Sequence, residues 1–133
     1  MADAANAPSF TTPQTGQTNY KKIAWTLNGV STGVPVKVAD YADKTFQAHD
    51  VNGGSTWGGA TLVLEGSMDA TADPAHADYA TSTWKTLTDT TETALSFTAD
   101  TDVVTVLQNP LWIRPRTSAG TTTTIYASLG VKK

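Results

Sequence analysis

Hydrophobic and polar residues alternate along several short stretches of this chain, which is the pattern of β-strands that bury one face. Ile23, Trp25 and Leu27 alternate with Lys, Ala and Thr neighbours, and Leu62 and Leu64 alternate in the same way further along. Further strands are predicted at residues 34–38, 44–49, 84–87, 94–97, 103–107, 111–116 and 122–129. About nine short strands at intervals near ten residues are typical of an antiparallel β-sandwich or barrel.

Turn residues separate the predicted strands. Asn28 followed by Gly29 is a strong signal for a β-hairpin. Pro35 lacks a backbone N–H, so the strand at residues 34–38 is expected at the edge of a sheet.

The predicted fold class is all-β, with an antiparallel β-sandwich formed as a single domain by residues 20–133. Residues 1–19 are rich in Ala, Thr, Gln and Pro, and Phe10 is their only aromatic side chain. Such a segment buries too little surface to order itself alone, so we expect an extended N-terminal arm that packs on another chain. A disordered leader explains the same composition. The predicted core consists of Ile23, Trp25, Leu62, Leu64, Phe97, Ile113, Ile125 and Leu129.

The composition argues against several classes of function. The 133 residues include no Cys, which excludes disulfides and thiolate metal sites and fits folding in a reducing cytoplasm. The net charge is −3 and the only basic cluster is the terminal Lys pair, so we expect no direct contact with nucleic acid. The chain begins without the basic and apolar regions of a signal peptide, and no apolar run approaches the ~18 residues that span a bilayer. We therefore expect no membrane partner.

No combination of residues predicts catalysis. His49 and His76 lie far apart, each with one Asp nearby, whereas a metal site needs at least three converging ligands. No Ser lies in a recognisable nucleophile turn. The expectation is a protein that is not an enzyme, with no catalytic, cofactor-binding or metal-binding residues.

Residues 68–83 show no clear period and predict a long surface loop. Asp69, Asp73 and Asp78 offer oxygen ligands for calcium, but their spacing matches no standard calcium loop, and a solvated loop is the simpler interpretation. One helical turn is expected after Asp73, because Pro74 suits the first position of a helix.

Four aromatic residues allow two interpretations. If Trp57, Tyr79, Trp84 and Trp112 are exposed in a row, they form a platform for sugar rings, whose apolar faces stack on aromatic side chains. Such a row would indicate a carbohydrate-binding sandwich or a fibre-tip domain. Packing in the core is the ordinary role of Trp in a small sandwich.

Arg114 and Arg116 point to the same side of their predicted strand, in line with Trp112. One interpretation is a structural ion pair, of the kind that exposed strands often carry at little energetic gain. The other is an interface, because planar Arg side chains beside a Trp are frequent at binding hot spots. Candidate ion-pair partners are Asp40, Asp43 and Glu65, and the interface candidates are Phe10, Asp73, Tyr79, Trp112, Arg114 and Arg116.

Five short segments follow one another along the chain, at residues 38–47, 59–67, 84–89, 94–98 and 113–116. Their order resembles that of small structural proteins encoded near the major capsid gene of tailed bacteriophages. Those proteins are capsid decoration, or cement, proteins with jelly-roll-like sandwiches. The loop at residues 68–83 is longer than the turn of that pattern, and the N-terminal arm has no counterpart in it.

The resemblance implies a jelly-roll-like, non-enzymatic virion protein that is made in the cytoplasm of the bacterial host. It would bind the outer surface of the capsid and stabilise neighbouring capsid subunits against the pressure of the internal DNA. Its partners would be the major capsid protein and further copies of itself in a homo-oligomer. The family transfers no catalytic residues to this chain.

Overall fold

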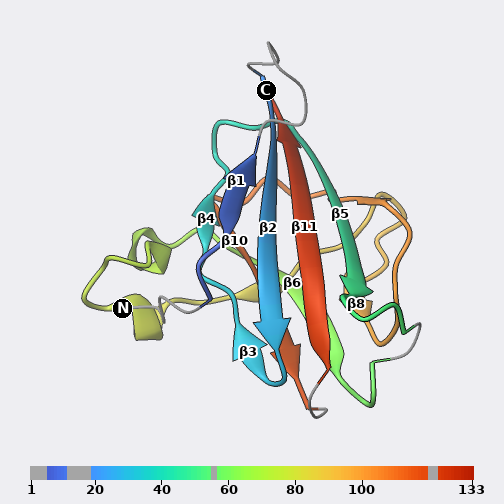
Figure 1. Cartoon of the computed structure of the whole chain (residues 1–133). Coiled ribbons are helices and arrows are strands. Elements are labelled where there is room, and N and C mark those ends of the chain that lie inside the picture. Colours follow the sequence, from blue (N-terminus) through green and yellow to red (C-terminus); the bar gives the residue numbers. More distant parts are fainter. Residues whose placement is uncertain (1–5, 12–18, 55–56, 120–122) are drawn as a thin grey trace.

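The computed structural model describes residues 6–11, 19–54, 57–119 and 123–133. It shows two antiparallel β-sheets packed face to face (Figure 1). The first sheet has the order β1 (Ser9–Thr11), β2 (Tyr20–Asn28), β11 (Thr124–Lys132), β5 (Asp43–Asp50) and β9 (Val104–Thr105). The second contains β3 (Ser31–Thr32) and β4 (Val36–Lys37) beside β10 (Trp112–Ser118), then β6 (Thr61–Ser67), then β7 (Lys85–Thr86) and β8 (Ser96–Phe97).

The chain crosses repeatedly between the two sheets. It runs from β2 to β3 and β4, back to β5, over to β6, β7 and β8, back to β9, over to β10, and ends in β11. The resulting neighbours, with β11 between β2 and β5 and with β10 beside β6, are those of a jelly roll. The predicted all-β, antiparallel, jelly-roll-like sandwich is therefore confirmed.

The facing sides of the two sheets form one hydrophobic core. Alternation along each strand places one set of side chains inside, because successive residues of a strand point to opposite faces. Phe97 packs at the border of the core, where its ring stacks on Phe46 with 6.1 Å between the ring centroids. The other predicted core residues are all buried: Ile23, Trp25, Leu62, Leu64, Ile113, Ile125 and Leu129.

The Asn28–Gly29 turn does not form the predicted hairpin. β2 belongs to the first sheet, whereas β3 pairs with β10 in the second. Gly29 has φ of 58°, the left-handed conformation that made the dipeptide a turn signal. Here the same conformation turns the chain from one sheet to the other, since closing the core requires β2 and β3 to lie on opposite sides of it.

The strand that contains Pro35 in the sequence-based prediction lies at a sheet edge. Pro35 lies directly before β4, which pairs with β10 at the edge of the second sheet, as predicted.

The prediction of a helical turn after Asp73 is wrong. The carboxylate of Asp73 accepts the backbone N–H of Ala75 at 2.9 Å, within a simple turn. Two short 3-10 turns, η2 (Ala70–Ala72) and η3 (Tyr79–Thr81), lie on either side of it.

The described part of the N-terminal arm, residues 6–11, packs on its own sandwich. β1 pairs with β2, with Phe10 opposite Ile23, and the backbone N–H of Val34 donates to the carbonyl of Asn6 at 3.0 Å. The expectation that the arm packs only on another chain is therefore wrong for these residues. Backbone pairing at the open edge of β2 orders them without a large buried side chain. Residues 1–5 and 12–18 of the arm lie outside the described residues.

One charged side chain enters the core. Lys44 lies on the inward face of β5 and is only 1% exposed. Its ammonium donates to the side-chain oxygen of Asn109 and, at 3.4 Å, to the carbonyl of Tyr41. Burial lowers the pKa of Lys44 below the ordinary lysine value, and the nearby carboxylate of Asp43 opposes this shift in part.

No helix in the described part of the chain is long and apolar enough to cross a membrane.

Truncating the core at Leu64 or Ile113 to Ala is expected to lower the free energy of unfolding by about 2–5 kcal/mol, because each change leaves a cavity in a packed interior. Denaturant unfolding measures the loss. Val103→Ala is the control, since Val103 is 63% exposed and its truncation should cost far less. Equal losses at the exposed and buried sites would contradict the described core.

Lys44 predicts a specific dependence of stability on pH. Its folded pKa lies below its unfolded pKa, so between these two values the unfolded chain binds more protons and the free energy of unfolding rises with pH. Below the folded pKa both states are protonated and Lys44 adds no slope. The wild type should therefore gain stability relative to Lys44→Met as the pH rises through the alkaline range. Denaturant unfolding of the two proteins at several alkaline pH values measures this difference, and equal pH profiles would contradict it.

Candidate functional site

The candidate site lies on the outer face of the second sheet, where β10 presents polar and aromatic side chains. Trp112, Arg114 and Arg116 alternate with the buried Ile113 and Pro115, so all three point away from the core. Along this face, β10 lies between β6 on one side and the short strands β3 and β4 on the other. The strand alternation predicted for this segment is confirmed.

Glu65 is the centre of the site. The register between β6 and β10 sets Glu65 directly opposite Arg114. Its Oε1 accepts the Nε–H of Arg114 and the Nε–H of Arg116, each at 3.1 Å. The side chains differ in exposure, at 8% for Glu65, 14% for Arg114 and 36% for Arg116. One carboxylate thus meets two guanidinium groups, and these three residues together carry a net charge of +1.

Aromatic residues in the long loop and directly after it cover Arg114. The guanidinium of Arg114 lies over the Trp84 ring, 4.0 Å from its centroid, and 5.9 Å from the centroid of Tyr79. It also donates to the hydroxyl of Tyr79 at 2.9 Å. A cation held over an aromatic face and paired with a carboxylate is fixed in place. Arg114 therefore ties residues 68–84 to the sheet, and Arg116 remains the more exposed cation.

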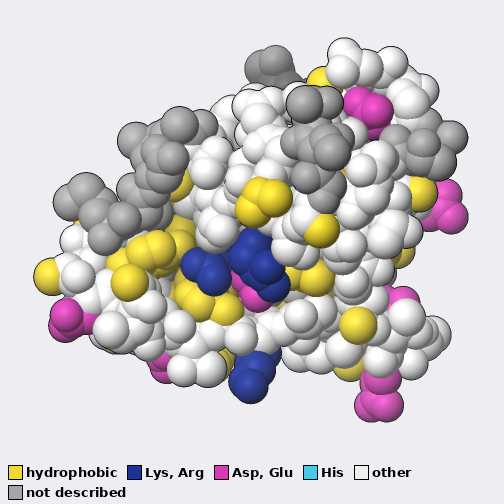
Figure 2. Space-filling view, turned by 90° about the horizontal axis from the view of Figure 1, so that it is seen from below, with side chains coloured by type: hydrophobic (Ala, Val, Ile, Leu, Met, Phe, Trp, Pro, Cys, Tyr) yellow, Lys and Arg dark blue, Asp and Glu magenta, His cyan; other side chains and the backbone are white. Residues whose placement is uncertain are grey.

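Figure 2 shows Lys and Arg side chains gathered around an acidic group on one face, with hydrophobic side chains beside them. This arrangement agrees with the contacts of Glu65, Arg114 and Arg116. We call these three residues, with Tyr79 and Trp84, the arginine cluster. Of the ion pairs considered from the sequence, the one with Glu65 forms, and the interface interpretation of the arginines stays a prediction.

Phe10 and Trp112 lie together in a groove next to the arginine cluster. The groove has a volume of about 470 Å³ and runs between the N-terminal segment and β4. Phe10 is 59% exposed, and Trp112 is half-buried. Five of the six interface candidates thus lie in the arginine cluster or in the groove beside it. Asp73 lies apart from both, in its turn of the long loop. The contributions of Lys21, Lys37 and Tyr41 to the groove were not predicted from the sequence.

The aromatic platform does not form as a row of four. Trp57 is fully buried, and its indole N–H donates to the carboxylate of Asp100 at 2.9 Å. The backbone N–H of Asp50 donates to the same oxygen, and these two bonds hold the pKa of Asp100 below its ordinary value. Trp57 is thus a core residue whose polar atom is satisfied. One face of Trp84 is taken by Arg114.

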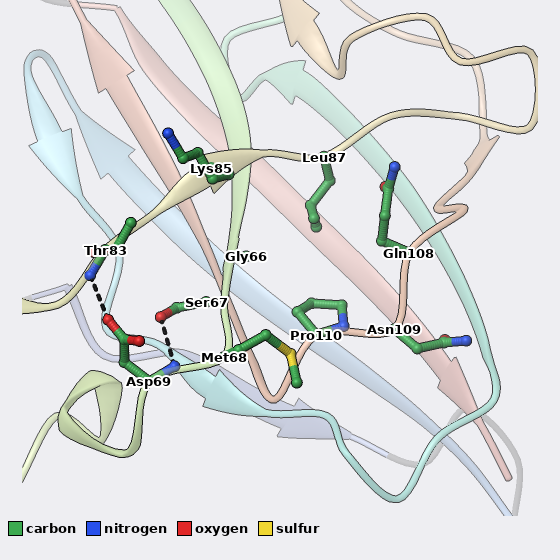
Figure 3. Close-up of a pocket in the computed structure, with 10 residues that line it drawn as sticks. All are labelled: Gly66, Ser67, Met68, Asp69, Thr83, Lys85, Leu87, Gln108, Asn109 and Pro110. Carbon is green, nitrogen blue, oxygen red and sulfur yellow. Dashed lines mark hydrogen bonds between the residues drawn. The ribbon is translucent and has the colours of Figure 1, made fainter.

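A second hollow, of about 360 Å³, lies between the end of β6, β7 and residues 108–110 (Figure 3). Gly66 forms its floor, where an added Cβ would come within 2.7 Å of Leu87 and 2.8 Å of Pro110. On one side, Asp69 accepts the backbone N–H of Thr83 at 2.7 Å. The carboxylate therefore serves to close the long loop rather than to face an open ligand site.

The remaining acidic and histidine residues form local contacts. Nδ1 of His76 accepts the backbone N–H of Asp78 at 3.0 Å, which orients a turn. His49 packs against Tyr126 on the outer face of the other sheet, with 5.4 Å between the ring centroids. Among the residues that the structure describes, no group of three or more His, Cys, Asp or Glu side chains is placed to hold a metal ion.

The fold is similar to a solved structure described as that of the SPBc2 prophage-derived protein YomS. The two structures superpose with a TM-score of 0.56 at 12% sequence identity, over 90% of this chain and 100% of that chain. At this identity the likeness shows a shared fold. No protein-family model and no curated protein sequence matches the chain.

The two arginines are expected to differ in their coupling to Glu65. Double-mutant cycles with Glu65→Gln should give about 1–3 kcal/mol for Arg114→Gln, whose contact is largely shielded from water. The cycle with Arg116→Gln should give about 0–1 kcal/mol, as for an exposed pair. Denaturant unfolding of the single and double variants provides both values. A larger coupling for Arg116 would show that the described order of burial is wrong.

Proposed function

We propose that this chain is a non-enzymatic structural protein of a tailed bacteriophage, which binds the outside of the capsid and cements neighbouring capsid subunits. The observation that carries the proposal is the shared fold with a prophage-derived protein over nearly the whole chain. The sequence resemblance to capsid decoration proteins supports the finer assignment to the capsid. The chain would be made in the cytoplasm of the bacterial host and would reach the virion by assembly.

Cementing needs no deep pocket, because its mechanism is multivalency. Each patch on a homo-oligomer binds weakly alone, but once one patch is docked the next faces its own site at a high effective concentration. Contacts that link neighbouring capsid subunits then oppose their separation by the packaged DNA.

The outer face of β10 has the side chains that such a contact needs. Trp112 and Arg116 are partly exposed on one strand, and Arg with Trp is a frequent pair at the centre of protein interfaces. The guanidinium of Arg116 shares Glu65 with Arg114, so its charge is only partly compensated. The partner favoured by this face is a protein surface with carboxylates or carbonyls.

The proposal predicts that the chain is present in purified virions and that its loss weakens the shell. Particles from a deletion of its gene should release DNA at a lower temperature than wild-type particles, because the capsid subunits lose their cross-links. When purified protein is added to particles that lack it, the protein should sediment with them and restore their heat resistance. Mass spectrometry and a dye-based DNA-release assay measure these outcomes. Absence of the chain from wild-type particles would rule the proposal out.

Variants on opposite faces locate the contact. Arg116→Ala should reduce co-sedimentation by more than the loss of an exposed ion pair, about 0–1 kcal/mol, would explain. His49→Ala, on the outer face of the other sheet, should bind as the wild type does. Both variants must melt close to the wild type for the comparison to count. If His49→Ala is the weaker binder, the contact lies on the other sheet.

A further inference from the structure

The aromatic side chains of the groove beside β10 come from three separate segments. The N-terminal segment supplies Phe10, the loop before β5 supplies Tyr41, and β10 supplies Trp112. Residues 6–11 are held at the edge of the first sheet by pairing with β2, and the hydrogen bond from the N–H of Val34 to the carbonyl of Asn6 ties them to the segment before β4. Phe10 and Trp112 therefore lie on paired strands, and Tyr41 lies in a turn closed by the hydrogen bond from its N–H to the carbonyl of Val38 at 3.0 Å. These walls are present before any partner binds.

The charge of the groove is opposite to that of the chain. Lys21 and Lys37 line it and are both exposed, and no acidic residue is among the described residues of its lining. The chain as a whole carries −3. The groove is thus a local basic and aromatic strip on an acidic protein, which favours an acidic partner over a basic one.

The strip continues along β10. Lys37 lies opposite Trp112 in the pairing of β4 with β10, and Arg116 follows Trp112 by four residues on the same face. Four residues of a strand span about 13 Å. An extended segment of about five residues therefore reaches from the lysines, past the aromatic groove, to the exposed side of Arg116.

We propose that this strip binds an extended acidic segment of a partner protein, in which carboxylates flank an aromatic or aliphatic side chain. The apolar side chain fills the groove between Phe10, Tyr41 and Trp112. One carboxylate lies near Lys21 and Lys37, and the next lies near Arg116. The attribution of the segment to the capsid protein rests on the proposed function, whereas its chemistry rests on the groove alone.

Two synthetic peptides test the chemistry without any capsid. The acidic probe is acetyl-Gly-Asp-Gly-Phe-Gly-Asp-Gly-amide, whose two Asp and one Phe share a face of the extended chain, and the basic probe replaces both Asp with Lys. In ¹H–¹⁵N titrations of the full chain, the acidic probe should shift the signals of Phe10, Lys37 and the Trp112 indole. The basic probe should bind at least about tenfold more weakly, because like charges then face each other. Equal binding of the two probes, or no shift at these residues, would overturn the proposal.

Charge reversal provides the matched comparison. The double variant Lys21→Glu, Lys37→Glu should lose the acidic probe and gain the basic one. The control variant Lys22→Glu, Lys85→Glu makes the same change in net charge, with Lys22 over the Tyr126 ring on the opposite face of β2 and Lys85 on β7. It should keep the preference for the acidic probe. If both variants lose that preference, the net charge of the chain would explain the binding of the acidic probe, and the proposal would be overturned.

Co-sedimentation with particles that lack the protein separates this inference from the proposed function. If the wild type, the control variant and the groove variant all bind these particles equally well, the cement function stands and the groove is not its contact. If the acidic probe binds the groove but no form of the chain binds particles, the groove stands and the capsid assignment fails. Sedimentation velocity tests the remaining occupant: self-association that disappears in the groove variant would show that a second copy fills the groove, contrary to the proposal.

Discussion

The pairing of β6 with β10 is the constraint on which the rest of the structure depends. These strands are far apart in the sequence, yet their register sets Glu65 opposite Arg114 on the outside and Leu64 opposite Pro115 on the inside. A shift by one residue would send the arginines into the core and the apolar side chains to the surface. The core and the arginine cluster thus lie on opposite faces of the same pair of strands. The same ladder carries Trp112 to the end of the face, next to the groove.

The sequence predicts the strands and the core well, because both follow from local alternation. It predicts less about which strands are neighbours, since that depends on contacts between distant segments. Asn28 and Gly29 illustrate the difference: their preference for a turn is local and correct, but whether the turn closes a hairpin or joins two sheets is decided by the packing of β2 against the other sheet. Residues 6–11 escaped prediction for a related reason, because backbone pairing at a sheet edge leaves no hydrophobic pattern.

The site was partly visible in the sequence. The shared direction of Trp112, Arg114 and Arg116 follows from the period of a strand, and Glu65 was one of three acids that could pair with them. The stacking of Arg114 on Trp84 could not be predicted, because it depends on how the long loop folds back over the sheet. The burial of Lys44 could have been inferred from the sequence, since strand alternation places it on the same inward face as Phe46. The aromatic residues of the groove come from three segments with no common pattern, so only the folded chain brings them together.

We propose that this jelly roll binds a partner on a phage capsid through the outer face of β10. Electron cryomicroscopy of purified wild-type particles would show this contact. We expect density for the sandwich outside the capsid lattice, with Trp112 and Arg116 facing the capsid protein and an extended segment of that protein in the groove. Particles without this density, or with the opposite sheet against the shell, would contradict it.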